Sequence, residues 1–352
     1  MSTINELKWA SMTGVVNEMK APNQFIKRLL FGNEQPVSTE TIEISVIEKD
    51  REIAPFVRKN GEALMVPGVG KTFQNVDAPN IRIKRPFTPS ELMFGRQPGT
   101  VIFPAQQEQV SAIQAHINRD LRAMNDMIAN TEEYMCSQAI QGSLSYEVAD
   151  EEVFQITYPK PSAHTVTLST FWDDATPSNV KLNTDFHTAK KLISDEVGLQ
   201  TTDVVLGEEA ATAFRNLVGG GHVKTLDIRN VNSGAVSFVE QFMDDGAMYL
   251  GSFDGIRVWE YSRTVSVGGV QTPLIRSKYA EFLAVSPAAE NVMYYGAIPD
   301  FDALEGRAWV GRRFSKSWME KDPSAQMALV HARPLPVPRR PGSMVSIKVV
   351  SG

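Results

Sequence analysis

The sequence of 352 residues contains a single cysteine, Cys136. One thiol can supply neither an intrachain disulfide framework nor a metal site built from several thiolates. The five histidines are scattered, without an H-E-x-x-H motif or a Cys/His cluster; they are His116, His164, His187, His222 and His331. We therefore expect no metal site and no cofactor.

Long apolar runs are also missing. No window approaches 18 uncharged apolar residues, the length that a membrane-spanning helix requires. The first twenty residues carry Glu6, Lys8 and Glu18 where a signal peptide needs an apolar stretch. The sequence therefore predicts neither a membrane span nor secretion by that route.

The charge is modest in total and uneven along the chain. Lys and Arg number 35 against 41 Asp and Glu, a net charge of −6, whereas a dedicated nucleic-acid-binding protein is usually basic. Residues Glu305–Gly352 hold nine basic and three acidic residues, a net charge of +6 that leaves −12 for the rest. Such asymmetry indicates contact with an acidic partner, which could be another copy of the chain.

A possible phosphate-binding loop fails on two counts. Pro67-Gly68-Val69-Gly70-Lys71-Thr72 resembles the end of such a loop, but Met65 stands where the first glycine is required. The loop must also lead into a helix, whereas Phe73–Pro79 reads as a strand or as irregular structure. We expect a glycine-rich turn without nucleotide.

Other candidate catalytic groups receive structural interpretations. The adjacent acids should cap helices or lie on solvated faces, since neighbouring residues rarely face one site; they are Glu132-Glu133, Asp173-Asp174 and Asp244-Asp245. Gly251-Ser252-Phe253-Asp254-Gly255 lacks the serine position of a nucleophile elbow. We expect His187 on a surface, Cys136 buried and Arg339-Arg340 in rim ion pairs, and we assign no catalytic, cofactor-binding or metal-binding residue.

One long helix dominates the pattern. From Ala105 to Gln141 apolar residues recur at steps of three and four, with Pro104 at the start and Gly142 beyond the end. Such a helix would be about 55 Å long. A compact globule of this chain length would measure only about 53 Å across. The sequence therefore predicts a flat or elongated molecule.

A second unusual feature is an extended arm. Thr41–Glu48 alternates apolar and polar residues, and Ile81–Lys84 repeats the alternation after more than thirty irregular residues. The simplest interpretation is a two-stranded ribbon formed by these two segments. Because an isolated ribbon is marginally stable in water, it must fold back or lie on a neighbouring molecule.

The remaining segments read as a mixed α+β protein. We expect helices at 4–10, 24–31, 185–197 and 208–217, a hinge or turn at 219–221, and strands at 153–158, 164–168, 203–206, 307–318, 326–333 and 344–350, with several more between 247 and 285. Pro334-Leu335-Pro336-Val337-Pro338 reads as a polyproline-like passage.

Taken in order, these segments resemble the lambda-type major capsid proteins of tailed bacteriophages, the major head protein E family. The resemblance rests on these segments: Phe25–Phe31, Thr39–Ser45, Ala54-Pro55-Phe56-Val57, Ile81–Lys84 leading to Pro89, Gln138–Gly142 at the helix end, and Ser315-Lys316-Ser317-Trp318 followed by Asp322-Pro323. It extends from about Pro22 to the end.

The resemblance implies the Hong Kong 97-like capsid fold. Its parts would be an N-terminal arm (1–45), an extended two-stranded loop (46–100), a peripheral domain (101–198) with a spine helix (105–141), an axial domain (199–284) and a second peripheral part (285–352). The ribbon would then lie across a neighbouring subunit.

The resemblance also implies a function that is structural rather than enzymatic. Such proteins assemble as hexamers and pentamers into an icosahedral shell around double-stranded DNA, with a scaffold, portal or decoration protein as possible partners. The protein would occur in the virion, and in the host cytoplasm during assembly. Charge complementarity between the basic tail and the acidic remainder could guide the register between copies.

Some relatives of this fold join subunits by Lys–Asn isopeptide bonds. No motif fixes such a site at Lys59 or Lys71, so we predict no cross-linking. Two alternatives remain: a soluble nucleotide-binding hydrolase that uses Gly68–Thr72, and a nanocompartment shell protein of the same fold.

Overall fold

The computed structural model describes residues 9–19, 24–48, 70–88, 106–148, 152–219, 241–242, 246–301, 308–322 and 324–352. Several sequence predictions lie wholly or partly outside this set: the helix start at Ile4, Lys59, the Gly220-Gly221 turn, the Asp244-Asp245 pair and the far end of the arm.

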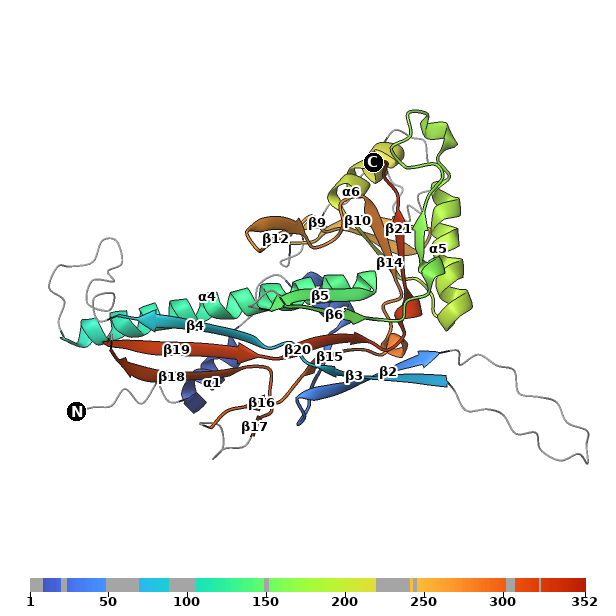
Figure 1. The fold of residues 1–352 in the computed structure, drawn as a ribbon. Coiled ribbons are helices and arrows are strands. Elements are labelled where there is room, and N and C mark those ends of the chain that lie inside the picture. The colour runs from blue at the N-terminus through green and yellow to red at the C-terminus, as the bar shows by residue number, and fades with distance from the viewer. Residues whose placement is uncertain are drawn as a thin grey trace, which may run out of the picture.

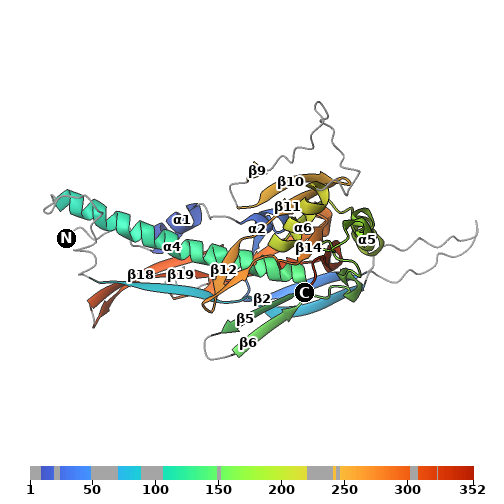
Figure 2. The same cartoon turned by 90° about the horizontal axis from the view of Figure 1, so that it is seen from above.

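The long helix is present almost as predicted. Helix α4 spans Gln106–Gln141, and Gly142 ends it with a backbone φ of 93°. Its inward stripe is fully buried over the last two thirds, at Leu121, Met124, Ile128, Met135 and Ala139. Figures 1 and 2 show α4 running along one side of an elongated layer. The apolar repeat therefore predicted both the helix and its packed face.

A three-stranded sheet lies against α4. Its order is β18-β19-β4, formed by Phe314–Lys321, Ser324–Ala332 and Ile81–Phe87. Ile81–Lys84 therefore pairs with the chain's own tail and not with Thr41–Glu48, so our predicted ribbon partner was wrong. The alternation identified a strand, but it could not identify a partner 245 to 251 positions away in the sequence.

Helix α1 (Trp9–Glu18) packs beside β18 and satisfies its outer edge. The Thr13 hydroxyl donates to the Ser315 carbonyl and accepts from the Ser315 amide, both at 3.0 Å. Asn17 donates to the Arg313 carbonyl at 3.0 Å. The N-terminal segment thus covers a strand edge that would otherwise be open to pairing.

The ribbon does exist, with a different second strand. β2 (Thr41–Glu48) pairs antiparallel with β3 (Gly70–Asp77), which begins inside the glycine-rich segment. Ile42 and Ile44 are buried at the base of the ribbon, whereas Glu43 between them is exposed. In Figure 1 the two strands extend away from the body of the molecule.

A seven-stranded sheet stands across the end of this layer, in the order β7-β21-β14-β8-β11-β10-β9. Its strands are Thr165–Thr167, Met344–Lys348, Tyr279–Leu283, Asp203–Leu206, Ile256–Glu260, Met248–Phe253 and Gln241–Phe242. Helices α5 (Leu182–Val197) and α6 (Glu208–Gly219) cover it. The Phe186 ring lies 5.0 Å from Phe282 and 6.4 Å from Phe214, so both helices pack on one face. Both helices were predicted.

The polyproline-like passage is instead a buried strand. β20 (Pro334–Pro338) pairs with β15 (Asn291–Tyr295), which also pairs with β1 (Asn33–Pro36). Prolines at every second position fit an edge strand, whose outward positions need no N–H for the ladder. Pro336 fits this pattern. Its carbonyl does not bond β15 but accepts a hydrogen bond from the Tyr158 hydroxyl at 2.5 Å.

Smaller elements complete the described chain. Helix α2 spans Phe25–Leu30, and three further strand pairs are β5–β6 (Ser143–Val148 and Glu152–Thr157), β12–β13 (Thr264–Val267 and Val270–Pro273) and β16–β17 (Ile298–Pro299 and Ala308–Trp309). Short 3-10 turns lie at Ser162–His164, Pro177–Asn179, Pro287–Ala289 and Pro341–Ser343. The single strand expected over 307–318 is therefore two, β17 and the start of β18.

Candidate functional site

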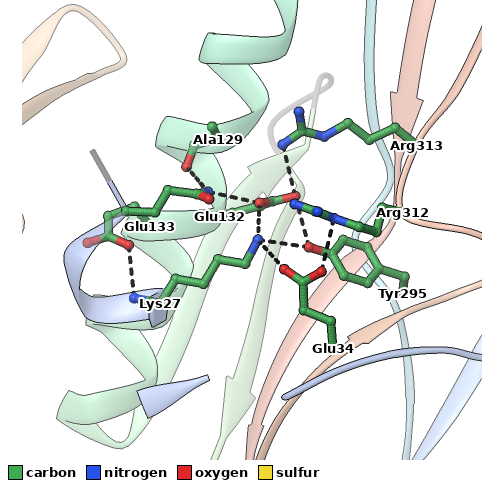
Figure 3. A network of polar contacts seen from close by, with 9 residues as sticks. Lys27, Glu34, Ala129, Glu132, Glu133, Tyr295, Arg312 and Arg313 are labelled. Carbon is green, nitrogen blue, oxygen red and sulfur yellow. Dashed lines mark hydrogen bonds and ion pairs between the residues drawn. The ribbon is translucent and has the colours of Figure 1, made fainter. Parts of the chain in front are cut away.

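A buried cluster of charges lies where α2, α4, β15 and the segment before β18 meet. Its centre is the adjacent pair Glu132 and Glu133 on α4, both completely inaccessible to solvent. We had predicted such paired acids at helix caps or on solvated faces, and for these two the prediction was wrong. Figure 3 shows the two side chains directed to different partners.

Glu132 is held by cations and an amide. Its carboxylate accepts from the Lys27 ammonium at 2.8 Å, from the Gln24 amide at 2.9 Å and from the Arg313 guanidinium at 3.4 Å. These donors come from α2 and its preceding residue, and from the residue before β18. One side chain of the long helix thus joins the N-terminal segment to the C-terminal strands.

Lys27 extends the cluster to β1 and β15. Its ammonium lies 2.9 Å from the Glu34 carboxylate and donates to the Tyr295 hydroxyl at 2.9 Å. Glu34, half-buried, also pairs with the Arg312 guanidinium at 3.0 Å. The dashed contacts in Figure 3 form one connected network.

The neighbours hold Glu132 and Lys27 in their charged forms. Burial opposes ionisation of Glu132, but Lys27 and Arg313 outweigh it and keep the pKa of Glu132 at about 2. Burial likewise opposes the charge on Lys27, and Glu132, Tyr295 and Glu34 outweigh it, so that the pKa of Lys27 is raised. Removing either partner would leave a buried charge uncompensated.

Glu133 has a different environment. Its carboxylate accepts from the backbone N–H groups of Ile26 at 2.7 Å and Lys27 at 3.0 Å, and from the Tyr261 hydroxyl at 3.1 Å. Burial raises the pKa of Glu133 to about 7, against the lowering effect of these hydrogen bonds. Two adjacent carboxyls therefore differ in pKa by several units because of what surrounds them.

A second polar junction ties the end of α4 to the seven-stranded sheet. Lys160 donates to the Ile140 carbonyl in the last turn of α4 at 3.0 Å and to the Ser346 hydroxyl at 2.8 Å. Ser346 also bonds Glu281, which pairs with Arg276 at 2.7 Å. Burial lowers the pKa of Lys160 to about 8. Ser346 is completely buried, so this Ser–Lys contact positions the two elements and offers a substrate no access.

The basic tail finds acidic partners inside its own chain. Glu34 and Glu132 pair with Arg312 and Arg313, and the remaining pairs are Arg333–Glu40 at 2.7 Å, Lys316–Asp300 at 2.8 Å, and Arg339 and Arg340 with Glu290 at 3.4 and 3.6 Å. The charge asymmetry predicted contact with an acidic partner, and our hypothesis was that it could guide the register between copies. These contacts show that much of it serves folding within one copy.

Of the other candidate residues, Cys136 lies near Glu133 on α4, and the rest are separate from this cluster. Lys71 and Thr72 lie in β3 with no helix after it, so the geometry of a phosphate-binding loop is absent there. His187 is exposed, Cys136 is fully buried, and Arg339-Arg340 form the expected ion pairs.

The described residues include no group of three or more His, Cys, Asp or Glu side chains able to hold a metal ion. Within the same residues, every helix is too short or too polar to cross a membrane. A cavity of about 570 Å³ lies between α6 and the Trp172–Pro177 segment; acidic side chains line it, including Asp173, Glu208 and Glu209.

Sequence reasoning missed the buried network, although one signal was present. Glu132 occupies the position four residues after Ile128 and three before Met135, so it continues the apolar stripe of α4. An acid on that stripe indicates a buried carboxylate with a partner. Lys27 inside the apolar run Phe25–Phe31 is the matching signal.

Both the sequence and the fold of this chain are similar to those of known families. The family model of phage major capsid protein E matches residues 8–349. No curated protein matches the sequence. Among solved structures, a prophage protein of E. coli CFT073 that is assigned as a capsid protein has a TM-score of 0.69 at 16% identity, covering 98% of this chain and 99% of that chain.

Two further structures share the fold. The capsid of cyanophage A-1(L) has a TM-score of 0.52 at 8% identity, with 95% of each chain covered. A phage-related protein of Bordetella bronchiseptica RB50 has a TM-score of 0.51 at 14% identity, covering 96% of this chain and 95% of that chain. The fold is therefore the Hong Kong 97-like capsid fold, as predicted. With its family model matched over nearly the whole length, the chain belongs to the phage major capsid protein E family, whose members are structural proteins of the capsid.

Proposed function

We propose that this protein is the main shell subunit of a tailed phage, which assembles as hexamers and pentamers into a closed icosahedral shell around packaged DNA. It is made in the host cytoplasm and ends in the virion. Scaffold, portal and decoration proteins are its expected partners, and it holds the DNA without reading its sequence.

The observation that carries this proposal is the ribbon. β2 and β3 have only each other as strand partners among the described residues, and eight residue pairs join them. A two-stranded ribbon needs a further apolar surface for stability. In the described chain Ile42 and Ile44 pack against the body at the base of the ribbon. The outer half of the ribbon would then pack on a neighbouring copy.

Many modest contacts suffice for a shell. Once a ring closes, each further contact is effectively intramolecular, so weak interfaces combine into a stable particle. Rings require head-to-tail interfaces, in which one surface of a subunit meets a different surface of the next. A flat subunit with a projecting ribbon fits that geometry better than a compact globule does.

The proposed division into parts follows the same architecture. Residues 1–45 would form the arm, 46–100 the loop, 101–198 and 285–352 the peripheral domain, and 199–284 the axial domain. The seven-stranded sheet also takes β7 and β21 from the peripheral ranges, so the axial unit is assembled from distant parts of the chain.

Electron microscopy of the purified full-length protein tests the proposal. Closed shells, or hexameric and pentameric rings, are expected. A monodisperse monomer at high concentration would contradict it. Nucleotide-dependent thermal stabilisation that disappears in Lys71→Ala would instead support the hydrolase alternative, and shells filled with a protein cargo would support the nanocompartment.

A further inference from the structure

The hairpin β12–β13 has one apolar face and one polar face. Its antiparallel register pairs Val267 with Val270 and Ser266 with Gln271. Successive residues of a strand point to opposite faces, so Val265 shares a face with Val267 and Val270. Ser266 and Gln271 lie on the other face. The alternating sequence therefore builds a ribbon whose three valines all point to one side.

The apolar face of the hairpin is covered at its base and open at its tip. Val265 packs against the buried core at the base, whereas Val267 is 41% exposed and Val270 is 67% exposed. In Figure 1 β12 extends outward from the seven-stranded sheet, above α4. The apolar face therefore continues past the surface that the same chain offers to cover it.

The hairpin is fixed at both ends. Gly268 and Gly269 form its two-residue turn with backbone φ values of 57° and 83°, which match the twist of the strands on either side. At the base the Leu274 N–H donates to the Arg263 carbonyl at 2.9 Å, and the Arg263 guanidinium donates to Asn130 of α4 at 2.6 Å. A preformed surface of this kind loses little conformational entropy when it binds a partner.

The chemistry of the tip determines which kind of partner it fits. Thr264–Ile275 contains no charged residue, so it offers no cation to a phosphate backbone and no counter-charge to a charged peptide. It offers apolar side chains and the outer edges of a sheet that has only two strands in the described chain. These groups fit an uncharged protein surface.

The small size of the tip favours another copy of this chain as that partner. A stable interface between two proteins buries about 1,200–2,000 Å² in total, and two exposed valines beside a tight turn supply only a small part of this area. Such a contact is useful between molecules that other contacts already hold together, as in a closed ring of copies. Copies of this chain meet that condition, because the members of its family are structural proteins of the capsid.

We propose that the apolar face of β12–β13 is an interface element, which packs Val267 and Val270 on a different surface of an adjacent copy in the assembly. This rests on the proposed function, since it requires that copies of the chain assemble. It adds a second contact to that of the ribbon β2–β3, from a different part of the molecule.

Val270→Glu and Gln271→Glu form a matched pair, because they add the same charge at neighbouring exposed positions on opposite faces of the hairpin. As unassembled chains, both variants should unfold at the same urea concentration as the wild type. Val270→Glu should raise the protein concentration needed for assembly at least about tenfold, because the added carboxylate would be buried without a partner. Gln271→Glu should assemble as the wild type does. Equal assembly of all three proteins, measured by sedimentation and electron microscopy, would overturn the proposal.

Photo-cross-linking identifies what covers the tip. Val270→Cys and Gln271→Cys each add one accessible thiol, because the native thiol of Cys136 is fully buried. Each unassembled variant is labelled with a maleimide photo-cross-linker, assembled and illuminated. Val270→Cys should give a product of twice the chain mass on a denaturing gel, and Gln271→Cys much less of it. If the label at Val270→Cys alone prevents assembly, that result also supports the proposal.

Three results would contradict this assignment. Assembled particles in which the label at Val270→Cys reacts only within its own chain, or only with a different protein, would overturn the hairpin contact and leave the proposed function intact. Equal products from the two labelled variants would also overturn it. A wild-type chain that forms no particles or rings would overturn both proposals.

Discussion

At the scale of single residues, environment decides what each charge does. Glu132 and Glu133 are adjacent on one helix and equally buried, yet one is ion-paired and the other is bound by backbone amides and a phenol. A buried ion pair is costly to break, because the remaining partner stays in a medium of low dielectric. A substitution in the buried network should therefore lower the stability of the fold more than a substitution in a surface ion pair.

Lys27→Met should destabilise the unassembled chain by about 3–5 kcal/mol, since it leaves Glu132 with one cation fewer in a fully buried site. Equilibrium unfolding in urea measures the change. The matched control is Lys190→Met, because the 2.6 Å pair with Asp254 is exposed and should be worth at most about 1 kcal/mol. Equal losses in the two variants would show that the buried network carries no special weight.

Lowering the pH should show how much the ionised Glu132 contributes to the free energy of unfolding. Its pKa falls from the ordinary 4.5 to about 2 on folding, so its stabilising effect is present above pH 4.5 and is lost as the pH falls toward 2. The loss should be on the order of 3 kcal/mol. Glu133 is protonated in the folded chain throughout this window and becomes protonated in the unfolded chain as the pH falls through 4.5, so its contribution has the opposite sign and is common to the wild type and to a variant of Glu132.

Unfolding free energies at pH 5, 4 and 3 for the wild type and Glu132→Gln provide the comparison. The wild type should lose stability more steeply than the variant does. Parallel curves would mean that Lys27 and Arg313 do not hold this carboxylate in its charged form.

Few of these side-chain contacts could be predicted from the sequence. The adjacent acids Glu132 and Glu133 were wrongly placed at helix caps or on solvated faces. The sequence could not show that Lys27 and Arg313 lie beside Glu132, because those contacts join residues separated by 105 and 181 positions. By contrast, the burial of Cys136 followed from its local pattern and is confirmed.

At the scale of elements, local patterns identified helices well and strand partners poorly. The stripe on α4 and the repeat in α5 are properties of one segment, so periodicity suffices to place them. The partner of Ile81–Phe87 is β19, chosen by packing over α4 and not by anything in the strand itself. A distant partner also explains β20. Its prolines favour an extended chain, and pairing with β15 makes that extended segment a strand of the sheet.

Two neighbouring positions on α4 test the packed face. Ile128→Ala should cost about 2–5 kcal/mol, because the side chain is fully buried between the helix and the three-stranded sheet. Met127→Ala, at a side chain 59% exposed, should change stability by less than about 0.5 kcal/mol. Thermal unfolding of both variants gives the answer, and similar losses would mean that the helix packs on a different face.

At the scale of the whole molecule, the described shape is a long layer with a sheet standing at one end and a ribbon leaving it (Figures 1 and 2). The length of α4 predicted this shape, since a helix as long as the globule is wide cannot be enclosed by it. The sequence also predicted a ribbon that must either fold back or lie on a neighbouring molecule, although it assigned the second strand wrongly.

The central claim is that the ribbon finishes its folding on another copy of the chain. A cryo-electron microscopy reconstruction of the assembled particle tests this most directly. We predict density for Thr41–Glu48 and Gly70–Asp77 packed on the body of an adjacent subunit. Density showing both strands folded back along their own chain, with no neighbour in contact, would contradict the account.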